Sequence, residues 1–127
     1  VVVAVSMAAV RPLAASLARS WPPGLPLRSC SKGIDLEGLC TASQLWGQQL
    51  PQAPTAVLSG PNLADELQRG LPAASVIASH DGNLASSRTR AVRTPNQRLY
   101  TNSDPIGTDA AGALKNVMAL AAGISDG

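Results

Sequence analysis

The stretch Val1-Val2-Val3-Ala4-Val5-Ser6 opens the chain with an unbroken apolar run followed by a polar residue. No polar residues alternate within the run, so it predicts a strand that is buried on both faces of a parallel sheet. Ser6 is a suitable N-cap for a helix that follows such a strand. The beginning of the chain therefore predicts a strand-to-helix unit.

The residues that follow continue this pattern. Val10, Leu13, Leu17 and Trp21 recur at helical spacing and form one apolar stripe, which the Pro-Pro-Gly sequence at 22–24 ends. We expect further strands at Leu27–Ser31, Thr55–Ser59, Ala74–Ser79 and Leu99–Thr101. We expect helices at Leu39–Leu50, Asn62–Arg69 and Asp109–Ile124. Trp46 should lie on the buried side of the first of these helices, and Gly70 should end the second. Strands that alternate with helices at this spacing predict an α/β fold with a doubly wound sheet.

Composition and charge exclude several classes of function. The net charge of +2 is too small to indicate a nucleic-acid surface, and the arginines at positions 88, 90, 93 and 98 are not interleaved with aromatic residues that could stack on bases. We interpret these arginines as a solvated helix face. The late apolar run Val117–Ile124 is far shorter than the roughly 18 residues that a membrane helix requires. Neither nucleic acid nor a membrane is expected as a partner.

The cysteines and the histidine carry no recognisable metal or redox motif. Cys30 and Cys40 form neither a zinc pattern nor a disulfide framework, so we interpret them as small buried residues and predict no metal. Val1–Val10 lacks the charged region and the cleavage site of a secretory signal, and we expect a cytoplasmic protein. His80 precedes Asp81 and Gly82 at a turn and is interpreted as a solvated loop residue.

The two lysines are the strongest candidates for chemistry. Lys32 follows one predicted strand and Gly60 follows another, and in α/β sheets ligands gather at the carboxyl ends of strands. Lys115 lies in a predicted helix that is apolar almost all round, where an ammonium group is costly to bury. A lysine in such a place suggests a need for a movable proton or a compact positive charge. Burial or a second nearby cation lowers the pKa of a lysine towards the range useful for acid/base chemistry.

Three strings in the chain resemble, in order and spacing, the NAD(P)-dependent glycerol-3-phosphate dehydrogenases. The strings are Ser31-Lys32-Gly33-Ile34-Asp35, Leu58-Ser59-Gly60-Pro61-Asn62-Leu63-Ala64-Asp65-Glu66 and Gly112-Ala113-Leu114-Lys115-Asn116-Val117. The resemblance implies that residues 1–103 are the later part of a Rossmann-type dinucleotide-binding domain. Residues 104–127 would then begin an all-α substrate domain of the 6-phosphogluconate dehydrogenase-like kind.

The resemblance also implies a reaction and roles for individual residues. The full-length enzyme would be a homodimer that interconverts sn-glycerol 3-phosphate and dihydroxyacetone phosphate with NAD or NADP, for glycerophospholipid synthesis. The implied catalytic residues are Lys115, as the acid/base, and Asn116, which would orient it or the substrate. The implied binding residues are Lys32 for substrate and cofactor, Gly60 and Asn62 for substrate, and Ala64 for cofactor.

Two features depart from the family pattern. The chain has no G-x-G-x-x-G turn for a pyrophosphate, and Ser86–Gln97 lacks the apolar stripe of the amphipathic helix expected there. We therefore expect a fragment that begins after the glycine-rich turn, ends within the helical domain and is inactive alone. Two alternatives stay open: a non-catalytic remnant, and a related two-domain hydroxyacid dehydrogenase, which also takes a catalytic lysine from an early helix of its second domain.

Overall fold

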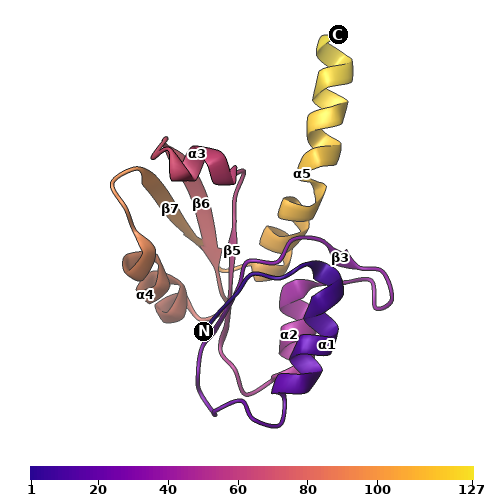
Figure 1. The fold of residues 1–127 in the computed structure, drawn as a ribbon, viewed down its shortest axis with the longest axis vertical. Helices are drawn as coiled ribbons and strands as arrows, with labels where there is room; N and C mark the ends of the chain where they lie inside the picture. Colours follow the sequence, from indigo (N-terminus) through magenta and orange to yellow (C-terminus); the bar gives the residue numbers. More distant parts are fainter.

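The computed structural model describes all residues, 1–127, and confirms the α/β class. A five-stranded sheet with the order β1-β2-β5-β6-β7 lies at the centre, with helices on both of its faces (Figure 1). Its strands are β1 (Val2–Val3), β2 (Leu27–Ser29), β5 (Thr55–Ser59), β6 (Ala73–Ala78) and β7 (Gln97–Asn102). The helices are α1 (Met7–Leu17), α2 (Ala42–Gln49), α3 (Ala64–Gln68), α4 (Gly82–Val92) and α5 (Pro105–Asp126). Strands β3 (Ile34–Asp35) and β4 (Cys40–Thr41) form a separate antiparallel pair.

The direction of the strands differs from that of a fully parallel doubly wound sheet. β1, β2 and β5 are parallel, but β6 pairs antiparallel with β5 and parallel with β7. The reason lies in α3, which has five residues and buries none of them. A parallel crossover needs a helix that packs back across the sheet face, and α3 instead stays at the carboxyl end of β5. The chain consequently returns as an antiparallel strand.

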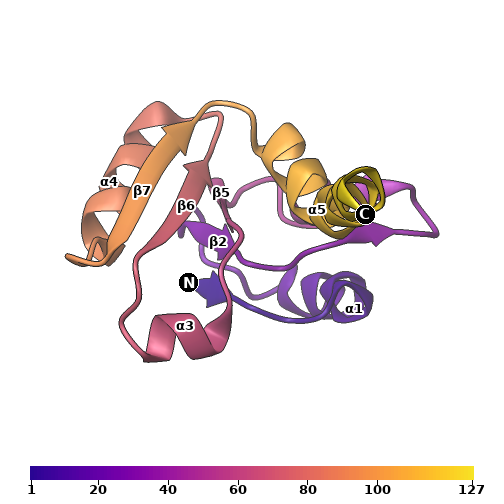
Figure 2. The ribbon, with the colours of Figure 1, turned by 90° about the horizontal axis from the view of Figure 1, so that it is seen from above.

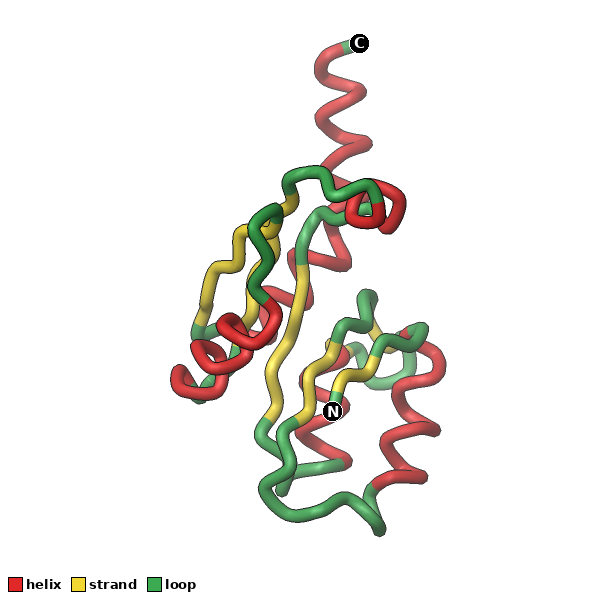
Figure 3. The backbone as a smooth tube through the Cα atoms, turned by 60° about the vertical axis from the view of Figure 1, so that its left-hand side comes forward, coloured by secondary structure: helices red, strands yellow, loops and turns green.

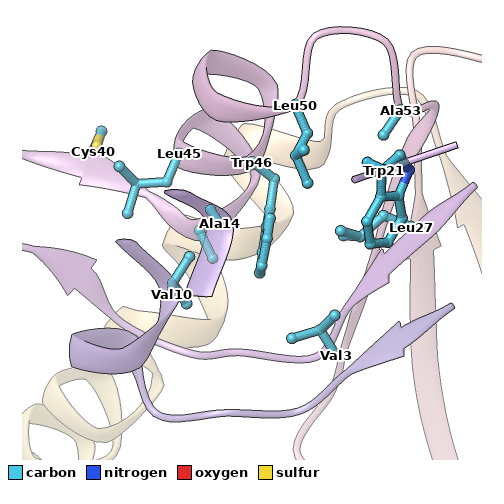
Figure 4. Close-up of a cluster of buried hydrophobic side chains, with 11 residues drawn as sticks. Val3, Val10, Ala14, Trp21, Leu27, Cys40, Leu45, Trp46, Leu50 and Ala53 are labelled. Atoms are coloured by element: carbon cyan, nitrogen blue, oxygen red, sulfur yellow. The ribbon is translucent and has the colours of Figure 1, made fainter. Parts of the chain in front are cut away.

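Two layers of helices bury the sheet unequally. α1 and α2 cover one face, where Val3, Leu27 and the fully buried Trp46 meet in the main apolar cluster (Figure 4). α4 covers the other face, and α4 and α5 lie on opposite sides of β6 and β7 (Figure 2). The buried residues of α4 are Leu84 and Ala85, which precede the segment Ser86–Gln97. Within that segment Val92 is the partly buried residue that packs against the same cluster, so most of the apolar contact of α4 comes from residues just before Ser86.

The first strand is shorter and more exposed than predicted. Val3 is 6% exposed, but Val2 is 61% exposed, because β1 is the edge strand and no helix covers its second face. The prediction of burial on both faces is wrong for this strand. Ser6 does stand at the N-cap of α1, although its side chain makes no capping hydrogen bond.

Two helices begin at other residues than predicted, because capping residues determine where each helix starts. α2 begins at Ala42 rather than Leu39, because Thr41 and Gln44 form a capping box; Leu39 precedes it in an exposed loop. α5 begins four residues before the predicted Asp109, since Asp104 accepts a 2.8 Å hydrogen bond from the N–H of Gly107 and caps it.

α5 leaves the body of the molecule after its first turns. Its buried residues, Pro105, Thr108 and Asp109, all lie near its beginning, and the turns after Lys115 extend away from the sheet (Figure 3). The large apolar side chains of its later turns are exposed, from 50% for Leu114 to 82% for Ile124. None of the helices, α5 included, is long and apolar enough to cross a membrane.

Candidate functional site

The carboxyl ends of β2 and β5 bring two of the predicted site residues together. The strands are paired in parallel, and each is followed by a loop that carries one of them, Lys32 or Gly60. The Lys32 ammonium donates a 2.9 Å hydrogen bond to the carbonyl oxygen of Gly60. Lys32 is otherwise exposed, so its charge faces solvent above this edge of the sheet.

The loop after Lys32 is held in place from α1. Gly33 has φ +126°, a conformation that side chains disfavour, and a Cβ atom there would lie 3.3 Å from the Cβ of Met7. Beyond it, the Asp35 carboxylate accepts hydrogen bonds from the Arg11 guanidinium and from the N–H of Gly38. The hydrogen bond from Arg11 is the main reason that the pKa of Asp35 is lowered. These contacts fix the strand-to-loop turn that presents Lys32.

Gly60 lies where two backbones approach too closely for a side chain. A Cβ atom at this position would be 2.6 Å from the carbonyl oxygen of Ala74 and 3.1 Å from the Cα of Ser75. Asn62 secures the same turn, because its Nδ2 donates a 2.6 Å hydrogen bond to the buried Ser75 hydroxyl. Asn62 is thus an anchor of the turn as well as a predicted substrate contact, and Leu63 takes the N-cap position of α3.

α5 reaches the same edge of the sheet and brings Lys115 with it. A Cβ atom on Gly112 would lie 2.5 Å from the Ser59 hydroxyl, so the helix passes close to the end of β5 at this residue, and a side chain there would require the hydroxyl to rotate away. Between helix and strand lies a cavity of about 400 Å³, lined by Ser59, Gly60, Gly112 and Lys115 among others. Lys115 is half-buried at its wall. Gly60 therefore borders the Lys115 cavity and also binds the Lys32 ammonium.

A buried carboxylate sets the position of α5. Asp109 is 4% exposed and accepts a 2.8 Å hydrogen bond from the N–H of Ser43 in the first turn of α2. Burial raises the pKa of Asp109, while hydrogen bonds from Ser43 and Thr41 act in the opposite direction. Lys115 stands six residues further along the same helix. The contact with α2 therefore helps to determine which side of α5 faces the cavity.

The remaining predicted site residues lie apart from this cavity. Asn116 is exposed and is not among the cavity residues, and Ala64 is exposed in the first turn of α3. Residues that our sequence reasoning missed are Ser59, Gly112 and Asp109. Gly112 could have been found, because it lies one helical turn before Lys115. The roles of all these residues stay predictions.

A second cavity of about 370 Å³ lies at the opposite end of β5, beside Thr55 and Ser79. His80 borders it and is exposed, as predicted for a loop residue, and no lysine contributes to it. No group of three or more histidine, cysteine, aspartate or glutamate side chains could hold a metal ion. The lysine-lined edge is thus the better candidate for chemistry.

The fold and this edge define a class of protein: a Rossmann-type α/β domain with the predicted site residues Lys32 and Gly60 at the carboxyl ends of its parallel strands. The family model described as "NAD-dependent glycerol-3-phosphate dehydrogenase N-terminus" matches residues 1–85. The chain belongs to this family.

Individual relatives agree with this assignment. A glycerol-3-phosphate dehydrogenase [NAD(P)+] from Synechococcus sp. (strain RCC307) is 60% identical over 102 residues, which are 80% of this chain and 34% of that protein. One from Synechococcus sp. (strain JA-2-3B'a(2-13)) is 47% identical over 98% of this chain and 40% of that protein. The crystal structure of the Coxiella burnetii glycerol-3-phosphate dehydrogenase superposes with a TM-score of 0.85, at 28% identity, over 98% of this chain and 38% of that one. The chain therefore spans well under half the length of these relatives.

Proposed function

We propose that this chain is part of an NAD(P)-dependent glycerol-3-phosphate dehydrogenase, which interconverts sn-glycerol 3-phosphate and dihydroxyacetone phosphate. The observation that carries the proposal is the arrangement around Gly60, which accepts a hydrogen bond from Lys32 and borders the cavity of Lys115. The names of the relatives, glycerol-3-phosphate dehydrogenases [NAD(P)+], support the same substrate and cofactor.

Lys115 and Lys32 would have different roles in the oxidation of the alcohol. Oxidation of a secondary alcohol removes the hydroxyl proton and transfers a hydride from the same carbon. Lys115, as the neutral amine, would take the hydroxyl proton, and in the reverse direction its ammonium would protonate the carbonyl oxygen. Lys32 would place a positive charge beside the anionic substrate. Bound NAD(P)+ would supply the hydride acceptor.

The residues present fit the reactive part of a dinucleotide site. Lys32 offers a cation at the carboxyl edge, and the neighbouring Ser31 hydroxyl is buried without a hydrogen-bond partner, so it is available to a ligand. Lys32 and, in α3, Ala64 are the residues that we propose would hold the cofactor. The sequence contains no glycine-rich turn for the pyrophosphate. We propose that this turn belongs to another part of the enzyme.

We further propose that residues 104–127 begin a second, helical domain after a dinucleotide-binding part that ends at residue 103. The exposure of Leu114, Met118 and Ile124 supports this boundary, because such a row of apolar side chains is typical of a helix that packs inside a larger domain. A homodimeric, cytoplasmic enzyme is part of the same proposal. The free thiols Cys30 and Cys40 agree with a reducing compartment.

The proposal is tested by assaying the full-length protein for reduction of NAD+ and NADP+ with sn-glycerol 3-phosphate and, separately, with 2- and 3-hydroxy acids. We expect turnover with the phosphorylated alcohol that is lost in Lys115→Ala. Activity with the hydroxy acids alone would indicate the related two-domain hydroxyacid dehydrogenases instead. A folded protein that turns over none of these substrates would be a non-catalytic remnant.

A further inference from the structure

Arg28 is a buried cation in the middle of β2. It is 7% exposed, and it pairs in register with Val2 on β1 and Ala56 on β5. Ala56 belongs to the apolar cluster beneath α4, so Arg28 lies on the α4 face of the sheet, opposite the main core. Because β1 is the edge strand, the guanidinium is enclosed close to the free edge of the sheet.

No carboxylate within the chain neutralises this guanidinium. Its single hydrogen bond runs from Nη2 to the carbonyl oxygen of Arg88 at 3.4 Å, and its Nε is buried without any partner. Both ion pairs of the structure are made by Arg11 instead. Burial lowers the pKa of Arg28, and the nearby positive charge of Arg88 acts in the same direction. A buried, unpaired guanidinium with five donors is costly, since buried charges are normally paired.

The surroundings of Arg28 combine positive charge with exposed apolar surface. A small cavity of about 40 Å³ is lined by Val1, Val2, Pro26, Arg28 and Arg88. Val1 and Val2 are 55% and 61% exposed. The cavity has room for a carboxylate group but is far too small for a nucleotide. The positive charge of Arg28 favours a carboxylate as its partner, and the exposed Val1 and Val2 beside it favour contact with apolar side chains.

We propose that Arg28 forms an ion pair with an aspartate or glutamate outside residues 1–127, on an apolar segment of the same protein that packs over Val1 and Val2. The positive charge of Arg28 is the reason to expect an acidic residue. The exposed valines at the free edge of β1 are the reason to expect that this residue lies on an apolar segment. The relatives are more than twice as long as this chain, so their remaining length is ample for such a segment.

The test measures the folding equilibrium constant of one variant in two contexts. Arg28→Met keeps an unbranched side chain and removes the charge. In the chain 1–127 it should raise the folding equilibrium constant about tenfold, because an unpaired buried charge is removed. In the full-length protein it should lower that constant about tenfold or more, because an ion pair is broken. Arg90→Met, at an exposed arginine of α4 that does not line the cavity, is the matched control and should change it no more than about twofold in either context.

Other occupants of the cavity would give different results. The same direction of change in both contexts would show that Arg28 has no partner outside the chain. If inorganic phosphate raises the melting temperature of chain 1–127 and Arg28→Met abolishes this effect, the site binds a free anion. Self-association of chain 1–127 that requires Arg28 would assign the cavity to a second copy. Each of these outcomes overturns the proposal.

A second measurement covers the case in which chain 1–127 aggregates. In the full-length protein, the Arg28 Nε–H resonance should exchange slowly with water at neutral pH. Neutralisation of one particular acidic residue outside 1–127, Asp→Asn or Glu→Gln, should make it exchange rapidly. If no acidic residue has this effect, the ion pair does not exist.

Discussion

The carboxylate of Asp109 accepts a 2.8 Å hydrogen bond from the backbone N–H of Ser43, 66 residues earlier in the chain. This contact joins the beginning of α5 to the first turn of α2, and it is buried. Lys115 follows less than two helical turns later. A single carboxylate therefore links the packing of the sheet domain to the position of the proposed acid/base.

Asp109→Ala should release α5 from α2. The Ser43 N–H would be buried without an acceptor, which costs about 1–3 kcal/mol of unfolding free energy. Asp109→Asn keeps an acceptor oxygen and should keep most of the stability. Urea unfolding of the full-length protein measures both, and Asp126→Ala at the exposed end of α5 is the control. Equal losses in the alanine and asparagine variants would mean that the hydrogen bond is not what anchors the helix.

Asp109 should also give the protein a pH-dependent loss of stability. Burial raises the pKa of its carboxyl above the ordinary 3.8, so the folded state binds more protons than the unfolded state between these two values. The contribution of this group to stability is therefore fully present below pH 3.8 and is lost as the pH rises through the raised pKa. The unfolding free energy of Asp109→Asn minus that of wild type should therefore increase as the pH rises through this window and stay constant at higher pH. Unfolding free energies measured from pH 3.5 to 7 check this, and a parallel pair of curves would contradict it.

Gly60→Ala should be strongly destabilising, unlike alanine at Gly47. Its Cβ would lie 2.6 Å from the carbonyl oxygen of Ala74, and neither backbone can move without disturbing β6. We expect a loss of about 1–3 kcal/mol, as for overpacking. Gly47→Ala in α2 is the matched control, because nothing lies within 4 Å of its Cβ position, and it should stabilise by about 0.5–1 kcal/mol. Thermal unfolding of the two variants compares them directly.

Lys32→Met should weaken substrate binding without unfolding the protein. The lysine is exposed and makes one hydrogen bond, to the carbonyl oxygen of Gly60, so the unfolding free energy should change by less than about 0.5 kcal/mol. Loss of a charged hydrogen-bond donor to an anionic substrate should raise KM about tenfold or more. Steady-state kinetics of the full-length enzyme measure this change. An unchanged KM would leave Lys32 with a purely structural contact to Gly60.

Lys115→Ala should lower kcat by about 10²–10⁴-fold, the range typical of a lost general acid/base. Lys115→Arg should restore little, because a guanidinium keeps the charge but does not release its proton near neutral pH. Dinucleotide affinity, measured by fluorescence titration of the full-length enzyme, serves as the control and should stay nearly unchanged. Turnover of the arginine variant within a few-fold of wild type would make Lys115 an electrostatic anchor rather than a proton carrier.

Local patterns in the sequence determined the α/β class, the positions of most elements and the motifs that carry Lys32 and Lys115. Apolar periodicity and turn residues report what each segment does by itself, and this is why β5 was predicted at Thr55–Ser59 as observed. The same reasoning placed Lys32 and Gly60 at one edge, since carboxyl ends of parallel strands meet there.

Contacts between distant segments were decided only by the tertiary structure. The direction of β6 depends on where α3 comes to rest, and the burial of Val2 depends on which strand is the edge. The sequence likewise does not show that the Asp109 carboxylate accepts a hydrogen bond from Ser43. Nor does it show that the buried Arg28 guanidinium has no carboxylate beside it. A sequence pattern records the type of a side chain and its local spacing. It does not record which groups from other segments will surround that side chain, and hydrogen bonds and burial depend on those groups.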